Sequence, residues 1–240
     1  MHSSDKSMKV AIVTPTYLRD AFLIQTLQYV LQQSAPWEIH WFILDDSPES
    51  SRHADTFENY PQIHYEWLNE KIPLGKKRNL LNEQAVLWGA DIICSMDDDD
   101  WYGPDYVKEM SELLCSSDEI LFTGSGDDYY LNISNGDILK IPAVREYTSC
   151  NGVLCYKAEA LKGRKYSDDA KFAEEHSFLN GVKVYQHPDI QKLHLALAHP
   201  NNTVTKKNYC RNETYRTELS LNDLPMQEAD RLFYLNLIKN

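Results

Sequence analysis

The segment from Asp91 to Pro104 constrains this chain most; it reads Asp-Ile-Ile-Cys-Ser-Met-Asp-Asp-Asp-Asp-Trp-Tyr-Gly-Pro. Residues 92–96 are apolar or weakly polar and predict a short buried strand. Four carboxylates, at positions 97–100, follow with no base between them, and their repulsion is costly unless a cation or water offsets it. Such a run is often only a solvated turn. Here the buried strand before it and the Trp-Tyr-Gly-Pro after it indicate that the acids are held in place.

The four carboxylates also predict a metal site. In an extended segment successive side chains alternate between faces, so Asp97 and Asp99 are expected on one face, with Asp98 and Asp100 on the other. Either pair could hold Mg²⁺ or Mn²⁺, which prefer oxygen ligands. At phosphate sites these ions commonly take one or two carboxylates together with the phosphates of the substrate.

Composition limits the class of protein. The chain has 240 residues, enough for one large α/β domain or two small ones, and its formal net charge is −12. This acidity argues against a broad nucleic-acid surface, although a small basic pocket for one phosphorylated ligand remains compatible with it.

Apolar runs and cysteines bear on the compartment. No apolar run approaches the roughly 20 residues that cross a bilayer, no secretory leader is apparent, and the polar residues 1–7 are expected to be frayed. The 5 cysteines lack Cys-x-x-Cys spacing and predict neither a disulfide framework nor a zinc site. We therefore expect no transmembrane segment and a cytoplasmic protein, free or peripheral to a membrane.

The first half alternates strand and helix patterns. Strands are expected over residues 9–14, 38–44, 63–68 and 92–96, with helices over 20–34 (Asp20 as N-cap) and from about 75 to 89. This order is typical of an open, mostly parallel twisted sheet flanked by helices, in which ligands bind beyond the carboxyl ends of the strands. Three strands end in polar clusters (14–17, 45–46 and 97–100), and their convergence at one edge predicts a binding site.

The second half predicts a smaller mixed or antiparallel region. The expected elements are a helix from Pro104 to about 114, a strand over 119–124, a hairpin of 129–133 with 138–141 around Asn135-Gly136, a strand over 152–156, a short helix over 158–161, and a last helix from 223. In that last helix Leu232, Tyr234, Leu235 and Ile238 would pack on the body or on a second subunit, as in a homo-oligomer. No linker is evident, so we expect one domain over 1–240, with halves 9–108 and 109–240.

Motifs within these elements resemble a known family. A Gly-x-Gly-x-x-Gly turn and a Gly-x-x-x-x-Gly-Lys-Ser/Thr loop are both missing, which argues against a dehydrogenase or a phosphate-loop NTPase. Instead four motifs resemble the family 2 glycosyltransferases, nucleotide-sugar enzymes of the GT-A fold, in the family's order. They are Thr-Pro-Thr-Tyr-Leu-Arg (14–19), Leu-Asp-Asp-Ser (44–47), Gly-Lys-Lys-Arg-Asn (75–79) and Met-Asp-Asp-Asp-Asp-Trp-Tyr-Gly-Pro (96–104), the last similar to the family's metal-binding Asp-x-Asp.

The resemblance implies a set of nucleotide-binding residues. The candidates are Thr14, Pro15, Thr16, Tyr17, Arg19, Asp45, Asp46, Lys76, Arg78, Asp97 and Asp98. Either acid of 45–46 would accept a hydrogen bond from the base, uracil being the commonest in the family. Arg78 would lie near the base or the diphosphate, with Lys76 as a phosphate partner. Simpler roles stay open: a turn cap for Asp46, solvated charges for Lys76 and Lys77, and a structural ion pair for Arg78.

The resemblance also implies a metal shell. Asp99 would ligate the metal together with Asp97, while counting back from Pro104 allows Asp98 and Asp99 as the pair. A histidine downstream sometimes completes the shell in GT-A enzymes; His199 is the candidate here, and His194 competes with it.

A pair of glutamates follows at the distance where the family usually has Glu-Asp, one member of which is the catalytic base. The pair here is Glu174-Glu175, and we choose Glu175 as the base; the alternative is an exposed acid favoured by a helix dipole. Nearby acids are expected to raise its pKa.

Together these features predict a metal-dependent glycosyltransferase using Mn²⁺ or Mg²⁺. It would move a sugar from a nucleotide-sugar donor, a UDP-sugar being favoured, to a glycan or other hydroxyl acceptor, with inversion as the resemblance implies. Two alternatives are a nucleotidyltransferase that makes sugar nucleotides, although its Gly-rich loop is missing, and a catalytically silent binding module of glycosyltransferase type. Four aromatic residues could stack on sugars or simply pack in the core: Trp101, Tyr102, Tyr129 and Tyr130.

Overall fold

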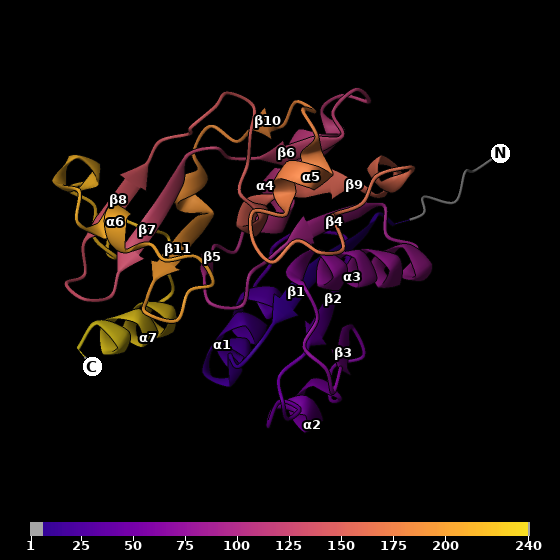
Figure 1. The fold of residues 1–240 in the computed structure, drawn as a ribbon, viewed down its shortest axis with the longest axis horizontal. Helices are drawn as coiled ribbons and strands as arrows, with labels where there is room; N and C mark the ends of the chain where they lie inside the picture. The colour runs from indigo at the N-terminus through magenta and orange to yellow at the C-terminus, as the bar shows by residue number, and fades with distance from the viewer. Residues whose placement is uncertain (1–6, 240) are drawn as a thin grey trace.

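Two β-sheets and the helices around them form the molecule (Figure 1), in a computed structural model that describes residues 7–239. The expectation about the opening residues therefore lies almost wholly outside the described part. The larger sheet has the order β10-β6-β9-β4-β1-β2-β3. Its strands are β1 (Lys9–Thr16), β2 (Glu38–Asp45), β3 (Ile63–Trp67), β4 (Ile92–Ser95), β6 (Phe122–Gly124), β9 (Cys155–Lys157) and β10 (Tyr185–Gln186).

This sheet is mostly parallel, as the sequence predicts. Strand β1 pairs in parallel with β2 and β4, and β2 pairs in parallel with β3, whereas β9 runs antiparallel to β4 and β6. The register sets Thr16 opposite Asp45, so β1 and β2 end side by side. The predicted convergence of polar strand ends follows from this pairing.

The smaller sheet has the order β5-β11-β7-β8 and mixes parallel with antiparallel pairs. The hairpin predicted around Asn135-Gly136 is confirmed, because β7 and β8 pair antiparallel on either side of it. The strands are β5 (Trp101–Tyr102), β7 (Asp128–Asn132), β8 (Ile138–Ile141) and β11 (His194–Ala198).

Helices cover both faces of the larger sheet. Alternate residues of β1 face opposite core clusters: Val10 and Ile12 join the side chains of α1 and α4, and Ala11 and Val13 join those of α3 and α5. The helices are α1 (Asp20–Leu31), α2 (Ala54–Phe57), α3 (Leu74–Trp88), α4 (Tyr106–Cys115), α5 (Glu175–Leu179), α6 (Lys207–Cys210) and α7 (Glu228–Lys239), with 3₁₀ turns η1 (Asn151–Val153), η2 (Ala158–Leu161), η3 (Ile190–Lys192) and η4 (Glu213–Tyr215).

Several predicted boundaries are wrong by a few residues. Helix α1 ends at Leu31 rather than 34, because Ser34 turns away and donates its amide hydrogen to the carbonyl of Pro104. Asp20 is its first helical residue, not an N-cap. Helix α4 begins after Pro104, at Tyr106. The last helix begins at Glu228, because the Asp223 carboxylate closes a separate turn with Ser220.

Helix α7 packs on the body of its own chain. Tyr234 is buried and hydrogen-bonds its hydroxyl to that of Tyr29 on α1 at 2.9 Å, and Gln25 of α1 donates to Asp230 at 2.8 Å. Leu232 on the same helix is 51% exposed. One core cluster contains both Val10 and Tyr234, so residues from both halves of the chain share it.

Candidate active site

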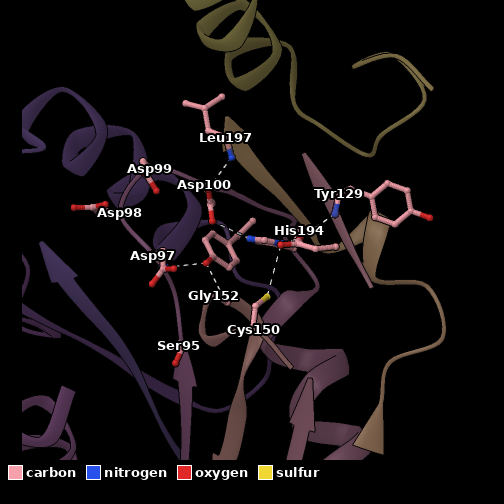
Figure 2. A network of polar contacts seen from close by, with 12 residues as sticks. Ser95, Asp97, Asp98, Asp99, Asp100, Tyr129, Cys150, Gly152, His194 and Leu197 are labelled. Atoms are coloured by element: carbon pink, nitrogen blue, oxygen red, sulfur yellow. Dashed lines mark hydrogen bonds and ion pairs between the residues drawn. The ribbon is translucent and has the colours of Figure 1, made fainter. Parts of the chain in front are cut away.

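The four consecutive aspartates occupy a turn. Strand β4 ends at Ser95, and Asp98 and Asp99 are turn residues. The prediction that Asp97 shares a face with Asp99, and Asp98 with Asp100, is therefore wrong. Figure 2 shows the four carboxyl groups pointing in different directions. Asp97, Asp99 and Asp100 each meet different protein partners, so the acids are not arranged as two pairs.

Asp97 is tied to α3 and to the smaller sheet. Its Oδ1 accepts a hydrogen bond from Arg78 Nη2 at 3.0 Å, and its backbone amide donates to the Tyr102 hydroxyl at 2.7 Å. Tyr102 in turn donates to the carbonyl of Gly152 at 2.7 Å. Burial raises the pKa of the Asp97 carboxyl, and the charge of Arg78 opposes that shift.

Arg78 links the aspartate turn to the pair of glutamates. Its Nε donates to Glu174 Oε1 at 2.6 Å, and Asn151 Nδ2 donates to the same oxygen at 2.7 Å. Arg78 is only 4% exposed, and its Nη1 has no hydrogen-bond partner among the described residues. The structural ion pair that the sequence left open for Arg78 is therefore present. One guanidinium nitrogen still remains for a ligand.

Glu175 is less constrained than Glu174. Asn151 Nδ2 lies 3.3 Å from its Oε2, and its side chain is partly exposed. Burial raises the pKa of Glu175, and the charge of Glu174 adds to the increase. The predicted direction is correct, although burial rather than like charge is the larger cause. A partly exposed carboxylate with a raised pKa is suited to accept a proton.

Asp99 lies among cationic or protonatable side chains. His199 Nε2 is 2.8 Å from its Oδ2, and Arg19 Nε is 3.5 Å from the same oxygen. The ring of Phe22 stacks on His199 with centroids 5.6 Å apart. Burial favours the protonated form of Asp99, but the hydrogen bond from His199 and the charge of Lys206 outweigh it and lower the pKa.

Asp100 faces the smaller sheet. Its Oδ2 lies 3.1 Å from His194 Nε2, and its Oδ1 accepts the backbone amide of Leu197 at 2.7 Å. The other ring nitrogen of His194 lies 3.2 Å from Asp128 Oδ1. Burial disfavours the charged imidazolium, but the two carboxylates outweigh it and raise the pKa of His194 to about 9. His194 is thus engaged by two acids other than Asp99.

The two acids that end β2 are buried and bonded within the protein. Asp45 accepts the Ser47 amide at 2.9 Å and the Tyr65 hydroxyl at 2.8 Å. Asp46 accepts the amide of Ile72 at 2.9 Å and forms an ion pair with Lys77. Asp46 is therefore more than a cap for the turn at residues 47–48.

The two lysines before Arg78 have unlike surroundings. Lys77, for which the sequence left a solvated charge open, is instead 4% exposed, and its Nζ donates to the carbonyl of Thr16 at 2.7 Å as well as to Asp46. Burial lowers its pKa, and the charge of Asp46 opposes the shift. Lys76, predicted as the phosphate partner, is exposed to solvent. Lys76 and Lys77 differ in exposure because adjacent residues of a helix point about 100° apart.

The first motif contributes less to the site than the sequence implies. Thr14 is fully buried; its hydroxyl donates to the carbonyl of Met96 at 2.7 Å and accepts from Trp41 Nε1 at 2.8 Å. Both hydrogen-bonding roles of the hydroxyl are used inside the core, so it is not available for the predicted contact with the nucleoside in this arrangement. Pro15 is buried beside it. The Thr16 hydroxyl, also buried, has no hydrogen-bond partner among the described residues.

Tyr17 and Arg19 stand at the edge of the sheet. Tyr17 is partly exposed, and Lys71 Nζ lies 3.5 Å from its ring centroid. Arg19 also donates to the carbonyl of Asn201, which fixes the loop after β11 next to Asp99. Asp98 lies on the β1 side of the turn, where burial and the charge of Asp99 raise its pKa well above the usual range.

Core packing accounts for two of the four aromatic candidates. Trp101 and Tyr102 are each 1% exposed. Tyr129 and Tyr130 are partly exposed, on opposite faces of β7. Tyr129 points away from the aspartates (Figure 2) and lines a cavity of about 420 Å³ with Lys140, Tyr147 and other polar side chains.

The sequence of residues 11–165 matches the family model described as Glycosyl transferase family 2. The chain belongs to this family. It is therefore a glycosyltransferase with the GT-A fold. No curated protein sequence matches the chain significantly.

Solved structures of low sequence identity share the fold of this glycosyltransferase. Residues 1–349 of S. aureus TarS give a TM-score of 0.58 at 17% identity, over 80% of this chain and 61% of that one. The same protein in complex with UDP-GlcNAc gives 0.56 at 16%, over 96% and 65%. The mannosyltransferase PcManGT from Pyrobaculum calidifontis, in complex with GDP-Man and Mn²⁺, gives 0.60 at 13%, over 85% and 59%. The chain thus spans less than two thirds of each of these structures.

The sequence did not single out Lys206, which extends from the loop before α6 towards the aspartate turn of the glycosyltransferase. Its Nζ donates to the carbonyl of Leu197 at 3.1 Å and lies 4.5 Å from the ring centroid of Tyr130. Burial lowers its pKa, but the charges of Asp100, Asp99 and their neighbours outweigh it and raise the pKa overall. In the sequence, Lys206 stands out only as a basic residue seven positions after His199.

The aspartate turn of this glycosyltransferase brings into contact side-chain groups that a divalent ion accepts. Over residues 7–239 no group of three or more His, Cys, Asp or Glu side chains is arranged to hold a metal ion. Asp99 and His199 supply one oxygen and one nitrogen donor side by side, and Asp97 is engaged by Arg78 instead. Two protein ligands fit an ion whose shell is completed by substrate phosphates.

Between residues 7 and 239, no helix of this glycosyltransferase is both long enough and apolar enough to cross a bilayer.

Proposed function

We propose that this glycosyltransferase uses a nucleotide-sugar, a UDP-sugar in the first place, as donor and a hydroxyl group of a glycan or other molecule as acceptor, with inversion at the anomeric carbon. The observation that supports this most is the arrangement around Arg78. This one side chain contacts Asp97 of the aspartate turn and Glu174, the neighbour of Glu175. A single buried side chain would thus connect the aspartate turn, where the donor binds, with the glutamate pair that holds the base.

Asp99 and His199 would hold Mn²⁺ or Mg²⁺, with the sugar-nucleotide diphosphate supplying further oxygens. A divalent ion bound there supplies Lewis-acid stabilisation of the negative charge on the leaving diphosphate. Imidazole is accepted by Mn²⁺ more readily than by Mg²⁺, so this pair favours manganese.

Protein cations would add to the stabilisation of the leaving group. Lys206 and Arg19 lie next to the aspartate turn, and Arg78 Nη1 has no protein partner among the described residues. Donors that are fixed in place before the reaction stabilise developing charge without reorganisation. Lys76 is not proposed for this role, because its side chain is solvent-exposed.

Glu175 would take the proton from the attacking acceptor hydroxyl. Its neighbour Glu174 is held by Arg78 and Asn151 and would serve to orient the pair. General-base catalysis of this kind contributes typically about 10²–10⁴-fold to the rate. The base of the nucleotide would meet Thr16, Tyr17 and the acids at the end of β2. Thr16 is the first candidate there, because it ends β1 opposite Asp45 at the end of β2.

The donor and metal are tested by thermal shift. UDP-, GDP- and dTDP-sugars are screened with and without Mn²⁺, and a ligand at 100 times its Kd should raise Tm by roughly 5–10 °C, because it binds only the folded state. Asp99→Ala should lose the Mn²⁺-dependent part of the shift and most of the transfer activity. The control is Asp118→Ala, at an exposed position. Undiminished turnover in Asp99→Ala would refute the metal assignment.

The same assay separates the two alternatives. A silent binding module would give the thermal shift without any turnover of the donor, and a nucleotidyltransferase would release pyrophosphate from a nucleoside triphosphate. The family match favours neither of them. We further propose that the enzyme works in the cytoplasm, free or at a membrane surface.

A further inference from the structure

We propose that His194 is a positioning residue that fixes the aspartate turn, and with it Asp99, against the smaller sheet. The inference rests on the proposed function, because it concerns the placement of the metal ligand Asp99. It goes beyond that function by assigning a role to a histidine that contacts Asp100 and Asp128 rather than Asp99.

His194 lies where three strands meet. It is the first residue of β11, pairs with Tyr102 of the antiparallel β5, and precedes the parallel ladder between β11 and β7. Its side chain is 1% exposed. A residue in this position can fasten the segment around β5, which follows the aspartate turn, to the body of the smaller sheet.

Both oxygens of Asp100 are held by β11. Oδ2 lies 3.1 Å from His194 Nε2 and Oδ1 accepts the amide of Leu197 at 2.7 Å (Figure 2). The next aspartate back, Asp99, contacts His199, just beyond the end of the same strand. Two consecutive aspartates therefore meet two histidines, one at the start of β11 and one just past its end. Displacing the first contact would shift the second.

A series of contacts begins at the second ring nitrogen of His194 and reaches the glutamate pair. This nitrogen, Nδ1, lies 3.2 Å from Asp128 Oδ1, and Asp128 Oδ2 accepts from Cys150 Sγ at 3.7 Å. Cys150 directly precedes Asn151, which donates to both glutamates. A continuous set of contacts thus runs from the aspartate turn to the side chain that anchors the candidate base.

Burial of this set favours a role in orientation over one in stability. Taking charged groups out of water costs several kcal/mol per ion, roughly, so well-packed apolar residues often stabilise a fold as well or better. An Asp–His–Asp set of three buried ionisable groups is thus a poor way to gain stability alone. It is an effective way to hold one carboxylate at a fixed angle, as outer contacts do for metal ligands.

The test measures Mn²⁺ affinity in the presence of UDP by electron paramagnetic resonance, which requires no turnover. His194→Leu should weaken Mn²⁺ binding about 10–100-fold, as other outer-contact substitutions do. His194→Gln, which keeps a side-chain donor, should restore part of the affinity. The matched control is His187→Gln, since His187 also contacts a carboxylate, Glu109 at 2.9 Å, outside the aspartate turn.

Each outcome decides the matter. If folded His194→Leu binds Mn²⁺ as the wild type does, the residue is structural only and this inference fails alone. If wild-type protein binds no Mn²⁺ with UDP, the metal assignment fails and takes this inference with it. Should His194→Leu not fold, Asp128→Asn replaces it: it keeps the shape of the side chain and is expected to weaken Mn²⁺ binding in the same way. Unchanged affinity in that variant would overturn the inference.

Discussion

At the scale of single residues, adjacent positions with the same or similar side chains have unlike surroundings. Glu174 Oε1 accepts from both Arg78 and Asn151, whereas Glu175 has a longer contact with Asn151 and a pKa raised by burial. Lys77 is buried against Asp46, whereas Lys76 is in solvent. The roles of such neighbours follow from their surroundings and can be separated by matched substitutions.

Glu175→Gln should lower kcat by about 10²–10⁴-fold, because the amide cannot accept the acceptor proton. Donor affinity should change less than about twofold, since uncharged Gln keeps the size of the side chain. Steady-state kinetics and calorimetric titration of the donor measure the two effects. If donor affinity falls while turnover survives, this acid has another role. Glu174→Gln is the comparison, and it should mainly disturb Arg78.

The pH profile of the reaction should show the raised pKa of Glu175. The base must be ionised to act, so activity is present above its pKa and is lost as the pH falls through it. Because burial raises this pKa above the ordinary 4.5, the acid limb of kcat/KM should lie above pH 4.5. Rates across the pH range measure the limb, and an acid limb at or below 4.5 would contradict the assignment. Glu175→Gln should abolish it.

At the scale of elements, α3 is fastened to the strand ends by a buried ion pair. Lys77 contacts Asp46 at the end of β2 and the carbonyl of Thr16 at the end of β1, and the side chains of the pair are 5% and 0% exposed. The helix start and the edge of the sheet therefore form one rigid unit beneath the proposed nucleotide site.

Lys77→Met should lower the free energy of unfolding by about 3–5 kcal/mol, because it leaves the Asp46 charge buried without its partner. Lys76→Met, one position earlier and exposed, should stay within about 0.5 kcal/mol of wild type. Urea unfolding followed by circular dichroism gives both values. Equal effects at the two positions would mean that the pair does not fasten the helix.

Element order could be predicted from the sequence, and side-chain direction at the strand ends could not. The apolar runs predict β1, β2 and β4 because buried parallel strands need continuous apolar residues. The turn at Asp97–Asp100 was missed, since a run of one residue type has no period that shows where extension stops. The bonding of the Thr14 hydroxyl could not be predicted for a related reason: the buried Trp41 indole nitrogen needs an acceptor, and that need appears only once β2 lies beside β1.

At the scale of the whole molecule, the two halves of the chain share their core. Helix α7, at the end of the chain, packs Tyr234 against Tyr29 of α1. Contacts of this range have no signature in local sequence, which is why the sequence left open whether the last helix covers the body or a second subunit. Lys206 was missed for the same reason, because its neighbours Tyr130 and Leu197 come from other strands.

Tyr234→Ala should lower the free energy of unfolding by about 3–5 kcal/mol, as expected when a buried aromatic side chain is removed from a core. Leu232→Ala, whose side chain is 51% exposed on the same helix, should cost much less. Because both halves share one core cluster, tryptophan fluorescence and circular dichroism should report a single transition. Two separate transitions would show that the halves fold independently.

The long-range contacts of Arg78 have a consequence for the synthesis of this enzyme. Arg78 touches an acid 19 positions away in the early half and another 96 positions away in the late half. During synthesis the aspartate turn leaves the ribosome long before Glu174 does. A chain interrupted between them would carry the aspartate turn and the proposed nucleotide residues but neither the base nor His199. Sugar transfer by the proposed route therefore begins only when the growing polypeptide has delivered its late half.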